Sequence, residues 1–299
     1  MHFLFICLSF SLSLAAAAKP KVVTTTTDPE ALVKVVGGDK VLVLALAKGT
    51  QDPHQIEAKP SYMVKMRDAD LVLAQGLELE AAWIVPLIQG ARNPKVAIGS
   101  SRFIELAEKL DPIDVPEGQV SRAQGDVHPG GNPHFQTDPI RLGRAAVLIA
   151  EKLGEIDGAN RALFKANAER YQKFLNEKSS EWSKRIAATK VTKIVTFHKS
   201  LAYFFARYGL TSPIQLEPRP GIPPTASHLL QVIELMKKQN VHLILTENYY
   251  DDKAAEKISK EVPGIHTALV PVSVGGEKNI ETGEQLIERI VKIIEGSAS

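Results

Sequence analysis

Cysteine is nearly absent from this chain. Cys7 is the only cysteine among 299 residues, and it lies in an apolar segment near the N-terminus. An internal disulfide is therefore excluded, and a cysteine nucleophile is unavailable for catalysis. Any metal site must be built from histidine, aspartate and glutamate side chains.

An excess of charge of one sign is also missing. The chain has 36 lysines and arginines against 34 aspartates and glutamates, which gives a formal net charge of +2. A nucleic-acid partner would normally require a concentrated basic face, so we expect none. With 44% hydrophobic and 23% charged residues, the composition is that of a folded protein.

Several catalytic and nucleotide-binding motifs are absent. The sequence contains no Gly-x-x-x-x-Gly-Lys-Ser/Thr phosphate loop, no Gly-x-Gly-x-x-Gly, no His-Glu-x-x-His and no Gly-x-Ser-x-Gly. These motifs would have indicated nucleotide binding, zinc-dependent proteolysis or a serine nucleophile. These chemistries are therefore discounted.

The N-terminus has the pattern of a secretory signal peptide. An apolar run from Phe3 to Leu14 is followed by four alanines and then Lys19. We expect residues 1–18 to be removed and the protein to be periplasmic, with an uncleaved membrane anchor as the alternative. Cys7 has no hydrophobic region before it, so we do not expect a lipoprotein. No later stretch approaches the ~20 apolar residues that cross a bilayer.

The rest of the chain alternates short apolar runs with longer helical patterns, which predicts parallel sheets covered by helices. Strands are predicted at residues 22–26, 41–46, 71–74, 95–98, 193–197, 214–216, 242–246 and 266–270. Helices are predicted at residues 29–36, 60–68, 79–89, 139–153, 201–208, 226–239, 253–261 and 284–295. The predicted fold class is α/β with two lobes, an N-terminal lobe of residues 19–138 and a C-terminal lobe of residues 190–299.

Residues 139–189 are expected to connect the two lobes. One apolar stripe at helical spacing runs through them, and its members are Phe164, Ala168, Tyr171, Leu175, Trp182 and Ile186. This stripe predicts a helix over about residues 159–188, which would extend ~45 Å at 1.5 Å per residue and run along both lobes. Because a helix is a stiffer connection than paired strands, we expect only small lobe movements.

Three of the eight histidines lie in loops that follow strands or close a lobe. His54 lies in the loop after the predicted strand 41–46, His134 in the loop that closes the first half, and His198 directly after the predicted strand 193–197. Ligands of open α/β sheets bind beyond the carboxyl ends of the strands, so the three imidazoles could meet in one cleft. Spacing alone leaves both a metal site and ordinary polar roles open.

The other candidates are weaker. His128 is either a surface residue of the long loop 114–131 or an auxiliary metal contact. Glu57, Glu247 and Glu281 are candidate carboxylates, for which a solvated or helix-capping role is the ordinary interpretation. A surface or structural role is expected for His228, His242 and His266.

Ordered landmarks over nearly the whole chain resemble those of the zinc/manganese-type substrate-binding proteins of ABC transporters, the ZnuA/TroA-like group. The landmarks are Asp52-Pro53-His54 with Glu57, Lys59-Pro60-Ser61, Ala69-Asp70-Leu71-Val72, Gln75-Gly76-Leu77-Glu78-Leu79-Glu80 with Trp83, Asn132-Pro133-His134-Phe135 with Asp138-Pro139, Phe197-His198 with Tyr203-Phe204 and Tyr208-Gly209-Leu210, and Glu217-Pro218-Arg219-Pro220-Gly221-Ile222-Pro223-Pro224. Several landmarks in order are far more specific than any one of them.

The resemblance implies two α/β lobes joined by a long helix, with a metal ion held between the lobes and delivered to a membrane permease. It gives metal-ligand roles to His54, His134 and His198. Manganese-selective relatives usually have Glu at the third position, so His198 favours Zn²⁺ as cargo, with Mn²⁺ or Fe²⁺ as the alternative. We expect a monomer. A zinc hydrolase is disfavoured because no general base is identifiable.

Three imidazoles leave one tetrahedral position open. The group commonly has Asp just before its last helix, where this chain has Thr282 with Glu281 beside it. Glu281 is therefore the expected fourth ligand, and water is an alternative. Glu247 and Glu57 are further candidates, either as that ligand or as partners that orient an imidazole. The chain lacks the His-rich loop of many zinc-type members, and only His128 marks that region.

Overall fold

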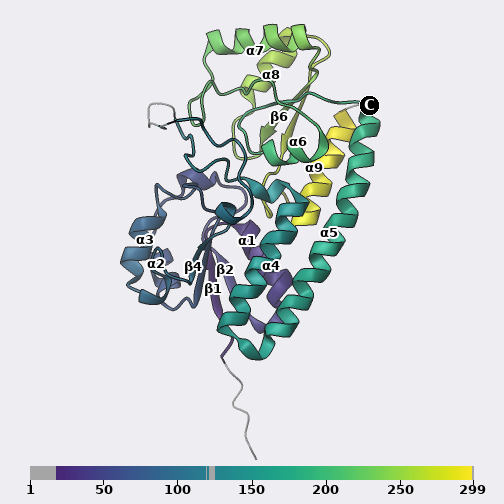
Figure 1. The fold of residues 1–299 in the computed structure, drawn as a ribbon. Helices are drawn as coiled ribbons and strands as arrows, with labels where there is room; N and C mark the ends of the chain where they lie inside the picture. Colours follow the sequence, from purple (N-terminus) through teal and green to yellow (C-terminus); the bar gives the residue numbers. More distant parts are fainter. Residues whose placement is uncertain (1–17, 119, 121–124, 298–299) are drawn as a thin grey trace, which may run out of the picture.

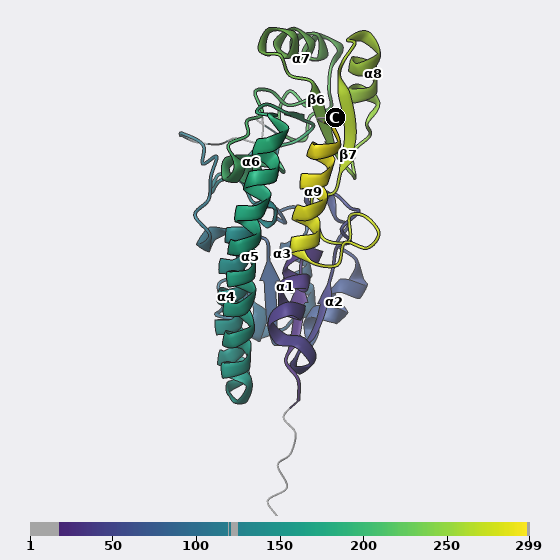
Figure 2. The ribbon, with the colours of Figure 1, turned by 90° about the vertical axis from the view of Figure 1, so that its right-hand side faces the viewer.

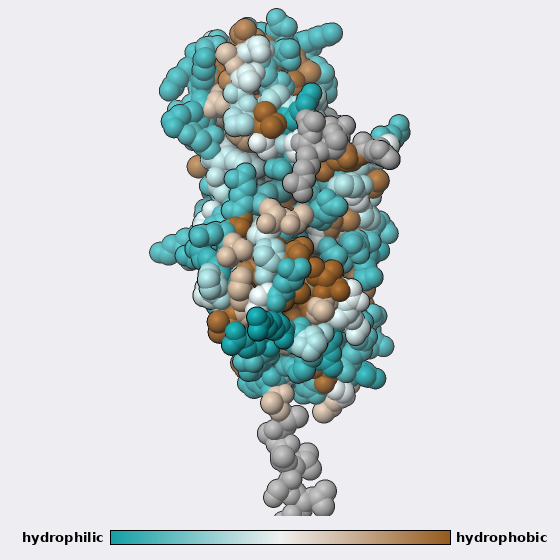
Figure 3. All heavy atoms as spheres, turned by 90° about the vertical axis from the view of Figure 1, so that its left-hand side faces the viewer, coloured by the Kyte–Doolittle hydropathy of each residue, from teal (hydrophilic) through white to brown (hydrophobic). Residues whose placement is uncertain are grey.

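The computed structural model describes residues 18–118, 120 and 125–297. The expected signal peptide, residues 1–18, lies outside the described residues except for Ala18. Two parallel sheets, one above the other in Figure 1, form the centres of two lobes. Within the described ranges, no helix has both the length and the apolar character needed to span a membrane. On the face in Figure 3, hydrophobic residues lie in small groups among hydrophilic ones.

The first lobe is built on four parallel strands in the order β2-β1-β3-β4. These strands are β1 (Lys21–Thr24), β2 (Leu42–Ala45), β3 (Leu71–Ala74) and β4 (Phe103–Glu105), and the helices are α1 (Thr27–Gly37), α2 (Pro60–Arg67) and α3 (Ile84–Ala91). Successive side chains of a strand point to opposite faces, so Val22 packs in the cluster that includes Leu32 of α1, whereas Val23 packs in the cluster with Met66 of α2. The sheet is therefore covered on both faces, as parallel sheets usually are.

The second lobe has three parallel strands in the order β5-β6-β7. Its strands are β5 (Val195–Thr196), β6 (Leu243–Glu247) and β7 (His266–Val270), and its helices are α6 (Ala202–Tyr208), α7 (Ala226–Gln239), α8 (Lys253–Glu261) and α9 (Gly283–Ser297). Ile244 packs in a cluster with residues of α7 and α8, whereas its neighbour Leu245 packs in the cluster that includes α9. The second sheet is thus also covered by helices on both faces.

Helices α4 (Pro139–Ile156) and α5 (Arg161–Thr189) pack side by side, and α5 runs along both lobes (Figures 1 and 2). The apolar stripe that predicted the long helix is the buried face of α5. At the upper end, Arg185 of α5 pairs with Glu288 and Glu295 of α9, at 2.8 and 2.7 Å. The long helix is therefore fixed to the second lobe by both apolar packing and charge.

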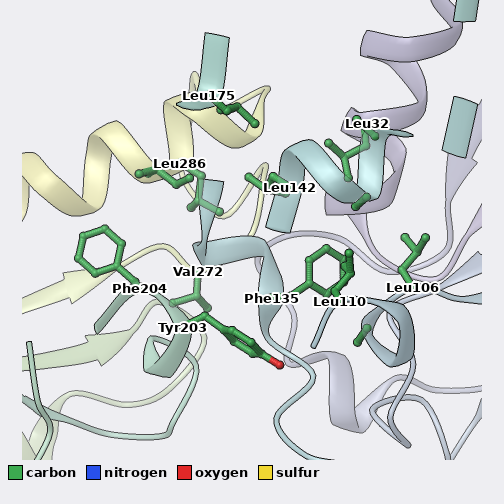
Figure 4. Packing of buried hydrophobic residues seen from close by; sticks show 14 of the residues in the cluster. Leu32, Leu106, Leu110, Phe135, Leu142, Leu175, Tyr203, Phe204, Val272 and Leu286 are labelled. Atoms are coloured by element: carbon green, nitrogen blue, oxygen red, sulfur yellow. The ribbon is translucent and has the colours of Figure 1, made fainter. Parts of the chain in front are cut away.

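One hydrophobic core continues from the first lobe into the second (Figure 4). Phe135 and Leu142 lie in the middle of the close-up, with Leu32 toward the first lobe and Phe204 and Leu286 toward the second. All five side chains are almost fully buried. Since close-packed interiors resist deformation, this core fixes the position of one lobe relative to the other.

A polar contact also joins the lobes at the start of α1. The Thr27 hydroxyl donates to the backbone carbonyl of Val274 at 2.6 Å, and the backbone N–H of Val274 donates to the Asp28 carboxyl at 2.8 Å. Burial raises the pKa of Asp28 to about 7. These paired hydrogen bonds hold the segment after β7 against the first lobe.

Two predicted strands differ from the structure. Residues 95–98 do not form a strand, because Asn93 and Pro94 start a short 3-10 helix, Pro94–Val96, in which the Asn93 side chain accepts a hydrogen bond from the backbone N–H of Lys95. The fourth strand is instead β4, only three residues long. Residues 214–216 contribute a single bridge, between Gln215 and Thr196, rather than a full strand.

We predict that the buried stripe of α5 carries much of the stability. Phe164→Ala should lower the free energy of unfolding by about 3–5 kcal/mol, since it opens a cavity at a fully buried position. Phe174→Ala is the matched control on the same helix, where the side chain is 38% exposed, and it should cost about 1 kcal/mol or less. Chemical denaturation measures both variants, and equal losses would contradict this view of the core.

Candidate metal centre

Three buried histidine rings meet between the lobes. The centroid distances are 5.4 Å for His54–His134, 5.4 Å for His54–His198 and 5.3 Å for His134–His198, so the rings form a nearly equilateral triangle. One ring nitrogen from each lies within 4.8 Å of the other two. The convergence expected from the strand ends is therefore present in the structure.

His54 is held by the residue two positions before it. Asp52 accepts hydrogen bonds from the backbone N–H of His54 at 3.0 Å and from its ring Nδ1 at 2.7 Å. The short 3-10 helix that carries His54, Pro53–Gln55, is fixed because the Trp83 indole N–H donates to the Pro53 carbonyl at 2.9 Å. Since Nδ1 is the donor to Asp52, the lone pair of His54 lies on Nε2.

His134 lies in a turn that is tied to both lobes. The Asn132 side chain accepts a hydrogen bond from the backbone N–H of His134 at 2.9 Å. It also donates a hydrogen bond to the carbonyl of Lys199, the residue after His198, at 3.0 Å. From the first lobe, Gln75 donates to the Pro133 carbonyl at 3.0 Å. The ring Nε2 of His134 is buried without a hydrogen-bond partner. Such an orphaned nitrogen is costly unless an ion or water satisfies it.

His198 lies two residues after the end of β5 and is held by two carboxylates. Its backbone N–H is directed at both oxygens of Glu247, at 3.2 and 3.3 Å. Its ring Nδ1 donates to Oε1 of Glu217 at 2.5 Å. In the neutral form of His198 the lone pair therefore lies on Nε2, as it does in His54.

Burial and charge set the protonation of the cluster. Burial, reinforced by the neighbouring histidines, holds the pKa of His134 well below its usual value, so this ring is neutral. For His198, burial alone would lower the pKa, but the hydrogen bond and charge of Glu217, together with the charges of Glu247 and Asp52, raise it. Burial also opposes ionisation of Asp52, yet its hydrogen bonds with His54 keep the pKa of that carboxyl low.

These features together fit a transition-metal ion. Neutral imidazoles bind such ions through one ring nitrogen, while the other ring nitrogen donates to a carboxylate or carbonyl that fixes the orientation. His54 and His198 both have this second contact, to Asp52 and Glu217. The buried Nε2 of His134, which has no hydrogen-bond partner, would supply the third donor.

The predicted carboxylates lie elsewhere. In the part of the chain that the structure describes, the group of metal-ligating side chains contains the three histidines and neither Glu57, Glu247 nor Glu281. Glu57 is exposed and approaches Lys59 at 3.7 Å. Glu281 is also exposed, and its backbone N–H donates to the Gln285 side chain. Glu247 is fully buried, which raises its pKa to about 7, and it contacts the backbone of His198 rather than the ring.

The residues that orient two of the rings were not assigned roles from the sequence. Asp52 and Glu217 both appear in the landmarks, but no role was given to either. A usable signal was present for each, because Asp52 is two residues before His54 and Glu217 directly follows the apolar segment 214–216. His128, in contrast, lies beside the cluster, with its ring centroid 5.3 Å from that of His54. It is not one of the three side chains whose ligand atoms lie within 4.8 Å of one another.

The family model described as zinc-uptake complex component A, periplasmic (ZnuA), matches residues 22–295 of this chain. The chain belongs to this family. The family consists of substrate-binding proteins of metal transporters, which are not enzymes, and this protein is therefore a metal-binding substrate-binding protein of an ABC transporter. A divalent metal ion is its cargo.

Relatives of this ZnuA-family protein are named for several metals. The iron-binding protein YfeA of Yersinia pestis is 25% identical over 92% of this chain and 85% of its own length. The zinc-binding lipoprotein AdcA of Streptococcus pneumoniae is 25% identical over 91% of this chain and 54% of its own length. The manganese ABC transporter substrate-binding lipoprotein PsaA of Streptococcus anginosus is 25% identical over 81% of this chain and 76% of its own length.

A crystal structure of ZnuA has the same fold. It is 26% identical, has a TM-score of 0.79, and covers 94% of this chain and 100% of its own. The predicted α/β fold class, with parallel sheets flanked by helices and one long helix, is thereby confirmed.

One expectation is wrong. We expected the protein not to be a lipoprotein, but relatives such as AdcA and PsaA are named lipoproteins. The expectation rested on the position of Cys7, which lies outside the described residues. A location outside the cytoplasm is consistent with these relatives.

We predict that Glu217 positions the ring of His198. Glu217→Gln removes the charge that stabilises Nδ1–H, and it should weaken metal affinity by about 10- to 100-fold. Glu234→Gln, at an exposed position of α7, is the matched control and should have no effect. Competition with a chromogenic chelator measures both variants, and unchanged affinity in Glu217→Gln would rule out this role.

Proposed function

We propose that this protein captures Zn²⁺ with His54, His134 and His198 and delivers it to the membrane permease of an ABC transporter. The observation that carries the proposal is the convergence of three buried imidazoles, with donor atoms within 4.8 Å of one another. Two of the rings have carboxylate partners that leave Nε2 free for a metal ion.

The composition of the site supports zinc over manganese or iron. Imidazole is a good ligand for Zn²⁺, whereas Mn²⁺ prefers oxygen-rich coordination. The described group of metal-ligating side chains contains three imidazoles and no carboxylate. The relatives named for iron and manganese keep those metals as the alternative cargo.

Delivery requires a site that holds the ion tightly and still opens to solvent. A cavity of about 490 Å³ reaches His54 from the surface, between Leu79 of the first lobe and Ile222 of the second. Since the continuous core holds the lobes together, we expect release by movement of the segments around this cavity rather than by wide separation of the lobes. We expect the protein to act as a monomer.

Metal competition tests the zinc assignment. Purified apoprotein should bind one equivalent of Zn²⁺, and Zn²⁺ should displace Mn²⁺, because three imidazoles favour zinc. His198→Ala should abolish tight binding. His242→Ala, at the exposed position just before β6, should leave binding unchanged. Isothermal titration with each metal measures these affinities. Stronger binding of Mn²⁺ than of Zn²⁺ would overturn the zinc assignment.

The pH dependence of metal binding should follow the protonation of the His198 ring. A protonated imidazole cannot bind metal, and contact with Glu217 raises the pKa of His198 above its usual ~6.5. Zinc affinity should therefore fall as pH drops, and the fall should begin above pH ~6.5, with a proton released on binding. His134, whose pKa is lowered by burial, should not contribute in this range. Equal affinity at pH 8 and pH 5 would contradict ligation by His198.

A further inference from the structure

His128 lies against His54 in a way that the three-histidine site does not explain. The Nε2 atoms of the two rings are 3.2 Å apart, and the rings are stacked at an interplanar angle of 28°. His128 also lines the 490 Å³ cavity that leads to His54, together with the acidic side chains of Glu78 and Asp126. The ring therefore lies where an ion entering through this cavity would reach the cluster.

The ring protons of both histidines are committed to other groups. The Nδ1–H of His54 donates a hydrogen bond to Asp52 at 2.7 Å, and the backbone of Leu77 accepts a hydrogen bond from the His128 ring. A neutral imidazole has only one N–H, so in the tautomer in which His128 gives its proton to Leu77, neither ring has a proton for the contact between them. Two lone pairs that face each other at 3.2 Å repel, and a cation between them makes the contact favourable.

The distance itself matches a shared zinc ion. Zinc lies 2.0–2.1 Å from imidazole nitrogen in tetrahedral sites, which places two ligand nitrogens about 3.3–3.4 Å apart. The observed separation of 3.2 Å is close to this value. The contact from His128 to the Leu77 backbone is also the kind of second hydrogen bond that fixes a metal-ligating histidine.

The backbone that receives this hydrogen bond is held in an unusual conformation. Leu77 and Glu78 have φ values of 54° and 64°, in the left-handed region that residues other than glycine rarely adopt. Such strain persists where the surrounding structure enforces it and is concentrated at functional sites. Here it accompanies the backbone contact that holds His128.

The segment that carries His128 is attached to the second lobe. The backbone N–H of Asp126 donates to the carbonyl of Pro220 at 2.9 Å. Gly125 has a φ of 84°, and a Cβ there would lie 2.1 Å from the Pro220 carbonyl oxygen, so only glycine fits this approach. The backbone N–H of Gly221 donates to Glu217 at 2.9 Å, and Glu217 also holds the ring of His198. One loop thus supports His128 and His198 together.

We propose that His128, which contacts His54 but lies outside the group of three mutually close ligand atoms, becomes the fourth metal ligand when an ion binds. The loaded site then has four imidazoles rather than three imidazoles and a carboxylate. The inference rests on the proposed function and deepens it, because it assigns the coordination position for which Glu281 was predicted. Four imidazoles and no carboxylate make the site selective for a borderline ion such as Zn²⁺ over Mn²⁺. Segment 125–129 closes the site over the bound ion by contact with both lobes.

X-ray absorption at the zinc edge, on the full chain loaded with one equivalent of Zn²⁺, tests this assignment. The wild-type protein should show four imidazole ligands, and His128→Ala should show three imidazoles and one oxygen. In chelator competition, His128→Ala should bind Zn²⁺ on the order of 100-fold more weakly, because each ligand of a closed site carries a large share of the binding free energy. His242→Ala, on an exposed histidine, should match the wild type.

Two further variants separate the possible failures. Glu281→Gln should keep wild-type affinity, and a loss there without a loss in His128→Ala would return the fourth position to the carboxylate and overturn the inference. Three imidazoles and one oxygen in the wild type would also overturn it, while leaving the proposed function intact. Undiminished zinc affinity in His54→Ala would instead contradict the proposed function itself. Thermal melts of the apoproteins verify that each variant is folded.

Discussion

The close packing that joins the two lobes is the constraint on which the metal centre depends. His54 comes from the first lobe and His198 from the second, so the distance between their rings is fixed only if the lobes are fixed. The core that runs through Phe135 and Leu142, together with the long helix α5, supplies this restraint. Because packed interiors have low compressibility, the histidine triangle is prepared in advance and little ordering is needed when an ion binds.

Within this frame, hydrogen bonds decide what the imidazoles can do. Asp52 and Glu217 take up the Nδ1 protons of His54 and His198, so that Nε2 of each ring is free to bind a cation. The same contacts keep negative charge close to the site, which partly balances the charge of a bound ion. The protein can thus bind a divalent ion in a buried place without leaving charge unpaired.

Much of this arrangement could be predicted from the sequence, and the failures have physical causes. His198 could be identified because it follows the apolar run predicted as strand 193–197, although β5 itself covers only Val195–Thr196. The sequence could not show that Glu281 is exposed, because its exposure depends on how the loop before α9 packs. The strand predicted at 95–98 failed because Asn93 and Pro94 impose a local turn that outweighs apolar character. The contact of His128 with His54 depends on residues 74 positions apart, which no local pattern records.

The central claim is that one metal ion binds between the lobes to His54, His134 and His198. A crystal structure of the zinc-loaded protein, with anomalous data collected on both sides of the zinc absorption edge, tests it most directly. The account predicts a single strong anomalous peak about 2.0–2.1 Å from a ring nitrogen of each of these histidines. A peak at another place, or no zinc peak within the histidine triangle, would contradict it.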